Sequence, residues 1–384
     1  MMFKLRVEEG APPGIYKEGK ADIVVKEGVF YNIYAEQSRS IGIIFFETYS
    51  RYKERGDLLY CEPLAATGVR GIRVALEMPS IGRVCLNDLS YDAYRNILEN
   101  VERNDLKGRV LVSREDANLH LLKHTSNARP DIIDIDPFGS PTPFIAAAVQ
   151  SIKHGGLLAA TATDIAPLCG VHGKSTFRKY HAKPIKASFC KETAIRIVLG
   201  AIARVAATFE AGIKPLASHA TRHYIRVYVE VVKRPSAADS SIENIGFIKY
   251  CPKCEWRSFV RGIATFLEPS CENCGSKTVM GGPLWIGSFS DLKFLELALK
   301  VVVDLNASRR DLKLVSTLLE ESFESPVYYQ LDELAGKYKT SSPPVKKIVK
   351  TLRGMGYKAS RTHLDPKGIR TNAPYHVLRE LVVS

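Results

Sequence analysis

The segment DLLYCEPLAATGVRG, residues 57–71, decides the fold. It opens on a short apolar run that ends at Glu62, as a buried strand does. A turn containing Gly68 follows, and after it apolar residues recur at the spacing of a helix. The segment therefore predicts a strand, a tight turn and a helix, which is the first half of a βαβ unit.

The same pattern continues along the chain. Further apolar runs predict strands at residues 81–86, 109–113, 132–135 and 157–161. Helical periodicity separates the early strands, and Ser90 is expected to cap the helix that follows residues 81–86. Strands that alternate with helices favour an α/β fold with a mostly parallel, doubly wound sheet.

The length predicts more than one domain, because a chain of 384 residues exceeds the roughly 100–200 residues of a typical domain. A strictly alternating strand at residues 224–232 is expected to close a first domain, residues 1–240. Residues 234–241 read as a linker. A smaller α+β domain, residues 241–384, is predicted to follow.

The smaller domain is predicted to have two parts. Residues 241–290 contain paired cysteines, and residues 291–384 are mostly helical. Near the end, a helix after Pro344 with lysines on its outer face precedes a basic hairpin, which is a winged-helix-like succession. A solvated basic helix face explains this pattern equally well.

The composition is that of a globular protein with an excess of positive charge. Apolar residues make up 45% and charged residues 25%, which excludes a largely disordered, collagenous or coiled-coil chain. There are 54 Lys and Arg against 41 Asp and Glu, a formal net charge of +13 that indicates an anionic partner. The sequence contains neither an apolar stretch that reads as a membrane span nor an N-terminal hydrophobic signal. We therefore expect a cytoplasmic protein that does not contact a membrane.

Four of the eight cysteines have the spacing of metal ligands. Two C-x2-C pairs are separated by 16 residues, which is enough for a hairpin that brings the pairs together. Zinc takes four thiolates tetrahedrally, and such a site leaves no open position for catalysis. The sequence predicts a structural zinc ion bound by Cys251, Cys254, Cys271 and Cys274.

An acidic residue ends or closely follows each of the first four predicted strands, namely Glu62, Asp88, Asp116 and Asp136. In a doubly wound sheet these positions meet at the edge where ligands bind. Asp88 lies 20 residues after Gly68, a distance at which an acid can bind ribose hydroxyls. The turn lacks the G-x-G-x-x-G pattern and the Walker lysine that bind phosphates. These features favour S-adenosylmethionine, an adenosine without phosphates, with Asp116 and the Ala117 N–H group binding its adenine.

The four residues Asp136-Pro137-Phe138-Gly139 indicate a pocket for a base amine. An exocyclic amine is a poor nucleophile, so it needs acceptors that hold its protons while a methyl group arrives. The Asp136 carboxylate and the Pro137 carbonyl provide such acceptors, and Phe138 can stack on the base. The alternative is an ordinary turn at the end of a strand.

Several motifs resemble those of the tRNA guanine-26 N2-dimethyltransferases. The segments that carry the resemblance are GVFYN at residues 28–32, ATGVRG at 66–71, Asn87-Asp88, DIDPFGSP at 134–141, the four paired cysteines, GGPLW at 281–285, SRTH at 360–363 and GIRTNAP at 368–374. Residues 33–40 depart from the family's usual pattern and keep Arg39, and Glu62 stands where Asp is more usual.

The resemblance implies an S-adenosylmethionine-dependent enzyme with a Rossmann-like class I methyltransferase domain, a zinc-ribbon-like segment and a C-terminal RNA-binding part. It implies that the cofactor is contacted by Arg39, Arg70, Asp88, Asp116 and Ala117. Glu62 and Gly68, on the same sheet edge, are further candidate cofactor-binding residues. It further implies that Asp136, Pro137 and Phe138 hold the guanine amine and that Phe30 stacks from the other side. The expected products are N2-methyl- and N2,N2-dimethylguanine at position 26 of tRNA.

Two basic segments are expected to bind the tRNA. Residues 171–191 contain six Lys and Arg, no acid and several aromatic residues that could stack on bases, including Tyr180 and Phe189. Residues 325–384 contain 11 Lys and Arg against 4 Asp and Glu. The candidate RNA-binding residues are Lys174, Arg178, Lys179, Lys183, Lys186, Lys346, Lys347, Lys350 and Arg361.

Two other functions fit parts of the pattern. The amine pocket by itself is compatible with an amino-methyltransferase that acts on another RNA or base. A non-catalytic zinc-ribbon and winged-helix protein that binds nucleic acid is the second alternative. No obligate protein partner is evident from the sequence.

Overall fold

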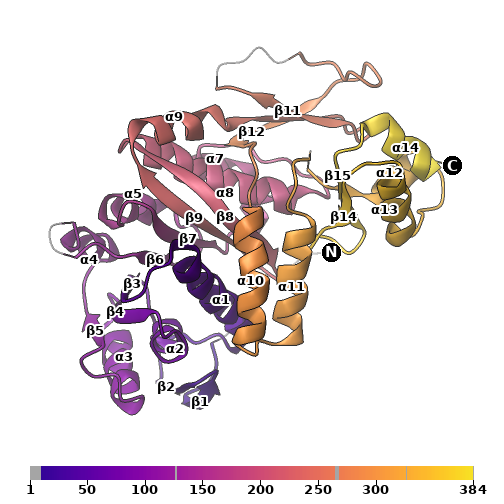
Figure 1. Cartoon of the computed structure of the whole chain (residues 1–384). Helices are drawn as coiled ribbons and strands as arrows, with labels where there is room; N and C mark the ends of the chain where they lie inside the picture. The colour runs from indigo at the N-terminus through magenta and orange to yellow at the C-terminus, as the bar shows by residue number, and fades with distance from the viewer. Residues whose placement is uncertain (1–9, 126–127, 264–267, 326, 384) are drawn as a thin grey trace. The chain divides into compact units, whose positions relative to one another are not determined.

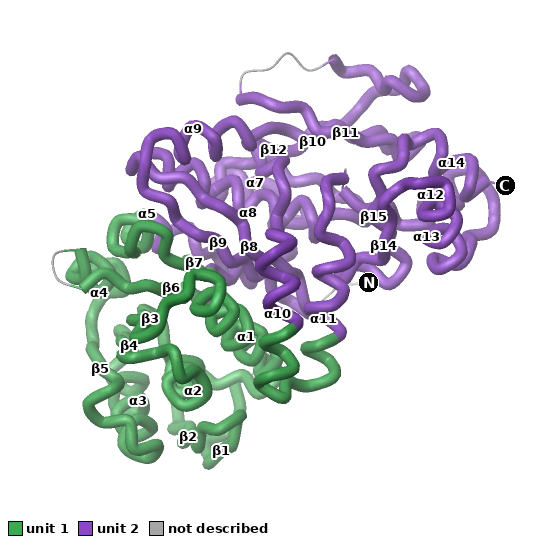
Figure 2. Tube along the Cα trace, in the orientation of Figure 1, with its two compact units in different colours: residues 1–136, 146–159, 300–312 green, residues 137–145, 160–299, 313–384 purple. Residues whose placement is uncertain are grey.

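The computed structural model describes residues 10–125, 128–263, 268–325 and 327–383 (Figure 1). The chain forms two compact units, each described here by itself (Figure 2). Unit 1 consists of residues 1–136, 146–159 and 300–312, and unit 2 consists of residues 137–145, 160–299 and 313–384. The predicted boundary between residues 240 and 241 stays a prediction.

Unit 1 contains most of the strands and helices that the first half of the sequence predicts. Its elements are β1 Gly14–Glu18, β2 Ala21–Val25, the 3-10 helix η1 Ile33–Ala35, α1 Glu36–Lys53, β3 Leu58–Glu62, α2 Val69–Glu77, β4 Ile81–Asn87, α3 Tyr91–Arg103, β5 Val110–Ser113, α4 Ala117–Lys123 and β6 Ile132–Ile135. Four elements contribute residues to both units, namely α5 Thr142–Ser151, β7 Gly156–Ala162, α10 Leu292–Asp304 and α11 Arg309–Glu320.

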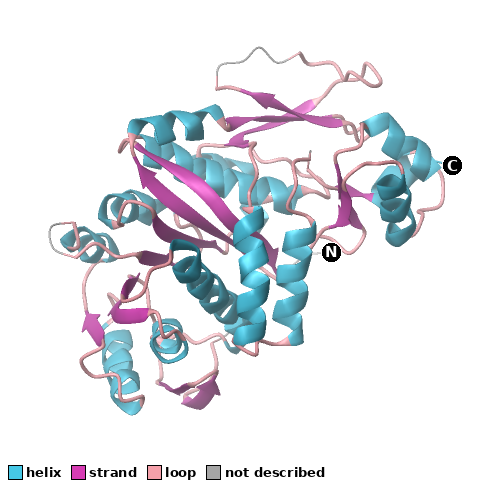
Figure 3. Ribbon diagram, viewed as in Figure 1, coloured by secondary structure: helices cyan, strands magenta, loops and turns pink. Residues whose placement is uncertain are grey.

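Unit 2 holds the remaining elements (Figure 3). They are α6 Ile165–Leu168, α7 Gly173–Tyr180, α8 Cys190–Ala207, β8 Ala211–Thr221, β9 Tyr224–Lys233, α9 Pro235–Glu243, β10 Ile245–Tyr250, β11 Arg257–Arg261, β12 Val279–Trp285, β13 Tyr329–Gln330, α12 Leu331–Lys337, α13 Val345–Gly354, β14 Ala359–Arg361, β15 Gly368–Thr371 and α14 Tyr375–Val383.

The main sheet has seven strands in the order β5-β4-β3-β6-β7-β9-β8. In unit 1, β3 pairs in parallel with β4 and with β6, and β4 pairs in parallel with β5. In unit 2, β8 and β9 form an antiparallel hairpin. Every residue of β3 and β6 is buried, as expected for parallel strands that are covered on both faces. The predicted mostly parallel, doubly wound sheet is confirmed.

The C-terminal part of unit 2 contains two smaller sheets. The first has the strand order β11-β10-β12. One cysteine pair lies between β10 and β11 in the chain, and the other lies between β11 and β12. The second has the order β13-β15-β14 and packs with α12, α13 and α14 around a core that includes Leu334, Ile348, Leu352 and Ile369. A short strand, two helices, a hairpin and the last helix α14 form this part, which confirms the winged-helix-like prediction.

The predicted linker at residues 234–241 is wrong, because residues 235–241 belong to α9 and Arg234 is its N-cap. Pro235 occupies the first turn of the helix, where its fixed φ and missing N–H group are tolerated. The small residues that suggested a linker instead allow close packing against β8. The Ser241 Oγ accepts a 2.8 Å hydrogen bond from the Ile213 N–H group, and a Cβ on Gly212 would come within 1.9 Å of the Ala237 carbonyl oxygen.

Candidate active site

The four predicted acids lie at the carboxyl ends of neighbouring parallel strands. Glu62 is the last residue of β3, Asp88 follows β4, Asp116 precedes α4 and Asp136 follows β6. The strand order turns back at β3, which lies between β4 and β6, and this reversal is where doubly wound sheets bind ligands. The predicted gathering of acids at one sheet edge is confirmed.

The turn between β3 and α2 is shaped by Gly68 and held by Asp88. Gly68 has φ +77° and caps α2, and a Cβ at this position would lie 3.2 Å from side-chain atoms of Leu86 and Ile97. One Asp88 oxygen accepts a 2.9 Å hydrogen bond from the Ala66 N–H group, and the other accepts one of 2.9 Å from Ser90. The Asp88 carboxylate is therefore oriented by the backbone on both sides of it.

Asp116 is exposed and caps α4. Its Oδ1 accepts hydrogen bonds from the N–H groups of Asn118 and Leu119, at 2.9 and 3.2 Å. Both bonds go to one oxygen, which leaves Oδ2 as an acceptor for a ligand. The neighbouring Ala117 is buried at the start of the helix. The assignment of Asp116 and the Ala117 N–H group to adenine stays a prediction.

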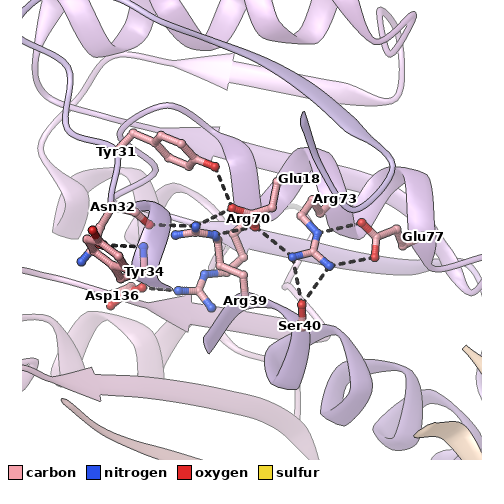
Figure 4. A network of polar contacts seen from close by, with 10 residues as sticks. All are labelled: Glu18, Tyr31, Asn32, Tyr34, Arg39, Ser40, Arg70, Arg73, Glu77 and Asp136. Carbon is pink, nitrogen blue, oxygen red and sulfur yellow. Dashed lines mark hydrogen bonds and ion pairs between the residues drawn. The ribbon is translucent and has the colours of Figure 1, made fainter. Parts of the chain in front are cut away.

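A buried arginine connects three of the carboxylates at this edge. The Arg70 side chain is 4% exposed, and its Nε lies 3.4 Å from Asp134 and 3.6 Å from Glu62. Its Nη2 forms an ion pair with Asp136 (Figure 4). The three carboxylates differ in access to solvent, since Asp134 is fully buried, Glu62 is 5% exposed and Asp136 is 27% exposed. Asp136 is thus the member of this group that a substrate can reach.

A second buried network contains Arg39 and centres on Glu18 (Figure 4). Arg39 donates from Nε to Glu18 at 2.7 Å and from Nη2 to the Asn32 carbonyl at 2.9 Å. Arg73 donates to Glu18 at 2.8 Å, and the Tyr31 hydroxyl donates to it at 2.9 Å. Burial alone would raise the pKa of Glu18, but Arg39 and Arg73 hold this pKa below its usual value. The carboxylate therefore stays charged and fixes Arg39.

No sequence pattern indicates Glu18 or Arg73 as a functional residue. Glu18 ends β1, 21 residues before Arg39, and Arg73 lies in α2 with no motif around it. The one available signal is helical spacing, because Arg73 lies three residues after Arg70 in α2 and so shares its side of the helix. The structure buries both side chains.

The Asp136-Pro137-Phe138-Gly139 segment is anchored after Asp136. In unit 2, the Gly139 N–H group donates to the Thr163 Oγ1 at 2.7 Å, and the Thr163 N–H group donates to the Gly139 carbonyl at 2.9 Å. Pro137 is buried, whereas Phe138 is 78% exposed. A large aromatic ring on a fixed backbone is thereby presented to solvent. In unit 1, Phe30 is also accessible, with 36% of its surface exposed.

The basic segment of residues 171–191 is partly helical. All five of its candidate RNA-binding residues are exposed, namely Lys174, Arg178, Lys179, Lys183 and Lys186. Lys179 lies 3.0 Å from Asp164, so its charge is partly neutralised by an acid outside the segment. In the winged-helix-like part, Lys346, Lys347, Lys350 and Arg361 are exposed as well.

The expectation that Tyr180 and Phe189 could stack on bases is wrong, because both are buried. The Tyr180 hydroxyl donates to Asp164 at 2.6 Å. The Arg257 guanidinium lies 4.2 Å from the centre of the Phe189 ring, inside unit 2. Phe177 is 64% exposed and is the aromatic side chain of α7 that can reach a ligand.

The four paired cysteines gather at one point in unit 2. The Sγ atoms of Cys251 and Cys274 are 3.6 Å apart, and those of Cys254 and Cys271 are 3.7 Å apart. All four lie within 4.8 Å of one another. Tetrahedral zinc with bonds of about 2.3 Å needs sulfur atoms roughly 3.8 Å apart, so the arrangement fits such an ion.

The sheet order, the glycine turn and the strand-end acids together define a Rossmann-like methyltransferase fold. A family model described as N2,N2-dimethylguanosine tRNA methyltransferase matches residues 12–383. The chain therefore belongs to this family, as its motifs predicted. In the part of the chain that the structure describes, every helix is too short or too polar to cross a membrane.

Individual relatives agree with this assignment. Proteins named tRNA (guanine(26)-N(2))-dimethyltransferase from Methanobrevibacter smithii and Methanosarcina barkeri are 35% and 36% identical over 359 and 362 residues. In both cases the match covers 92% of this chain and 91% of the relative. The structure of Trm1 from Pyrococcus horikoshii in complex with S-adenosyl-L-methionine is similar with a TM-score of 0.84 and 34% identity. That match covers 95% of this chain and 98% of the other.

Replacing Arg70 should destabilise unit 1, because it leaves buried carboxylates without their arginine. We expect Arg70→Leu to lower the free energy of unfolding, measured by urea denaturation, by about 3–5 kcal/mol. Lys107→Leu is the control, since its pair with Glu102 is exposed and should contribute less than about 1 kcal/mol. The double variant Arg70→Leu/Asp134→Leu should recover part of the loss. An Arg70→Leu chain as stable as the Lys107→Leu control would contradict this role.

Proposed function

We propose that this chain transfers methyl groups from S-adenosylmethionine to N2 of guanine 26 in tRNA, giving N2-methyl- and N2,N2-dimethylguanine. The observation that carries the proposal is the position of Asp136. Among the three carboxylates around Arg70 it is the accessible one, and it directly precedes Pro137 and the exposed Phe138. Membership of the family over residues 12–383 supports the same reaction.

The residues at the strand ends fit the cofactor. When bound, S-adenosylmethionine supplies a methyl group on a positively charged sulfur. We assign Asp88, which the backbone already orients, to the ribose hydroxyls, and Asp116 Oδ2 with the Ala117 N–H group to adenine. The turn around Gly68 has no phosphate-binding motif, which agrees with a ligand that lacks phosphates.

Arg39 and Arg70 are the proposed basic contacts of the cofactor, and Glu62 lies on the same edge. Each arginine already binds a carboxylate of the chain, Glu18 for Arg39 and Asp136 for Arg70. A guanidinium has five N–H donors. The bond to the carboxylate therefore fixes the orientation of the guanidinium plane, and the remaining N–H groups can donate to a ligand. In this arrangement the acids orient the arginines before the cofactor arrives.

Asp136 and its neighbours act on the base. The Asp136 carboxylate accepts a hydrogen bond from the guanine amine, and so does the Pro137 carbonyl. As the nitrogen forms its bond to the methyl carbon, the bond between that carbon and sulfur breaks and its electron pair stays on sulfur. Asp136 takes the proton that the amine loses. Phe138 and Phe30 are proposed to stack on the base, which must leave the helical stack at a cost of a few kcal/mol.

The exposed cations of α7 and of the winged-helix-like part are the proposed contacts of the tRNA backbone. Phosphate contacts by Lys and Arg supply affinity without reading sequence. They can thereby offset the cost of displacing the base. A cytoplasmic location, where tRNA is available, is part of this proposal.

We also propose that the four-cysteine cluster binds a structural zinc ion. The four sulfur atoms fill a tetrahedral shell, so the ion would have no position for substrate. Its contribution would be to fold a segment whose own core consists largely of the cysteines and Trp256.

The reaction is tested with a tRNA transcript and S-adenosylmethionine, with modified nucleosides mapped by mass spectrometry. We expect both methylated guanines at position 26 and neither on a transcript with adenine there. Asp136→Asn should lower the transfer rate by about 100-fold or more, because proton acceptance by a positioned base contributes on this scale. Cofactor affinity, measured by calorimetry, should change little. Asp304→Asn, which removes another arginine-paired carboxylate, should keep full activity; an active Asp136→Asn enzyme would refute the assignment.

The tRNA surface is tested by the salt dependence of binding. The log–log slope of affinity against salt should fall by roughly 0.7–0.9 for each phosphate contact that is removed. Lys174→Gln/Lys183→Gln should therefore reduce the slope by about 1.4–1.8. Lys107→Gln/Lys123→Gln is the matched control, because both lysines are exposed but lie outside the two basic segments. Equal slopes for the two double variants would show that α7 and its flanks do not contact phosphates.

The metal is tested by elemental analysis of the purified chain. We expect about one zinc ion per chain in the wild type and a large loss in Cys271→Ser. This loss should be accompanied by a lower thermal midpoint, since the cluster organises its segment. Cys169→Ser removes a thiol outside the cluster and should retain the metal. Full zinc content in Cys271→Ser would contradict the assigned ligand set.

A further inference from the structure

Asn87, the last residue of β4, has no exposed surface and uses its whole hydrogen-bonding capacity. Its Nδ2 donates to the carbonyl oxygens of Pro63 and Glu115, both at 3.0 Å. Its Oδ1 accepts from the Ser113 hydroxyl at 2.8 Å and from the Glu115 N–H group at 3.0 Å. An amide has two donors and one oxygen with two lone pairs, so all four are satisfied.

These four bonds connect the ends of three neighbouring strands. Pro63 begins the turn after β3, and Ser113 and Glu115 lie at the end of β5 and just beyond it. The backbone adds to the connection, because the Asn87 carbonyl accepts from the Ala65 N–H group at 2.9 Å. One side chain therefore sets the spacing between the turn that carries Gly68 and the segment that carries Asp116.

The network continues from Ser113 back to β3. The Ser113 Oγ is 2.9 Å from His120 Nδ1, and His120 Nε2 is 3.5 Å from Cys61 Sγ. Burial lowers the pKa of His120 to about 4, so the ring is neutral at neutral pH. Since the Ser113 hydroxyl gives its proton to Asn87, it can only accept from Nδ1–H. The Cys61 thiol then donates to Nε2, and the Asn87 amide fixes the direction of the entire chain of hydrogen bonds.

We propose that Asn87 is a positioning residue of the cofactor site, which sets the affinity for S-adenosylmethionine without touching it. The buried amide holds the loops after β3, β4 and β5 at the separation that the cofactor requires. Asp88, Gly68 and Asp116, all assigned to cofactor binding, lie on these three loops. The choice of ligand rests on the proposed function.

The test compares Asn87→Asp with Asn96→Asp. The first variant keeps the shape of the side chain but brings a carboxylate against the Pro63 and Glu115 carbonyls, where donors are required. Asn96 is equally buried and makes two hydrogen bonds, to the Val24 carbonyl at 2.9 Å and from the Lys26 N–H group at 3.3 Å, and neither goes to one of the three loops. Asn96→Asp therefore measures how much stability is lost when any buried asparagine of unit 1 is replaced by aspartate.

We expect Asn87→Asp to weaken S-adenosylmethionine binding by about 10-fold or more in calorimetry, with kcat at saturating cofactor nearly unchanged. Asn96→Asp should lose comparable thermal stability and retain wild-type affinity. If Asn87→Asp does not fold, Asn87→Ser, which retains one donor, should show an intermediate loss of affinity. Wild-type affinity in a folded Asn87 variant, or equal weakening in the Asn96 control, would overturn the inference. A wild-type chain that fails to bind the cofactor would instead overturn the proposed function on which the inference rests.

Discussion

The arrangement of the candidate site depends on the ion pairs of one buried arginine. Glu62, Asp134 and Asp136 lie at the ends of adjacent strands, where unpaired carboxylates would repel one another and lose hydration. The Arg70 guanidinium, itself almost inaccessible, neutralises this group from α2. The three carboxylates differ in exposure, since Glu62 and Asp134 are buried and Asp136, the one proposed to act on the base, reaches solvent.

Buried carboxylates paired with arginines occur elsewhere in the chain, so its positive residues do not all have the same function. Glu18 is bound by Arg39 and Arg73, and in unit 2 the fully buried Glu192 is bound by Arg196 at 2.9 Å and Arg370 at 2.7 Å. The buried cations are almost all arginines, whereas lysines dominate the proposed RNA-binding residues. A planar, weakly hydrated guanidinium suits buried carboxylates, and a strongly hydrated ammonium suits a surface that meets phosphates. Part of the arginine content is therefore structural, and the exposed lysines contribute the charge that can meet a ligand.

Local features of the structure could be predicted from the sequence, and features that depend on distant partners could not. The parallel strands, the Ser90 cap and the cysteine pairs follow from spacing within a few residues, and the structure contains all of them. The small residues at 234–241 were misread because their helix depends on contact with Gly212, more than 20 residues earlier. Tyr180 and Phe189 were misread because an aromatic residue between cations has the same sequence pattern whether it faces solvent or the core. The bonds of Glu18 and Asn87 join residues 13 to 55 positions apart and leave no local pattern.

Asn87 shows why an uncharged side chain occupies the centre of a site that is rich in charge. Its neighbour Asp88 must remain a carboxylate if it is to bind ribose hydroxyls, and a second acid beside it would add repulsion. Two carbonyls and one N–H group of the adjoining loops also need partners, because they lie against the fully buried Asn87 side chain. An amide meets both demands, since it donates twice and accepts twice without a net charge. The charges of this edge are thereby limited to those that bind a ligand or balance one another, and its loops are held together by neutral hydrogen bonds.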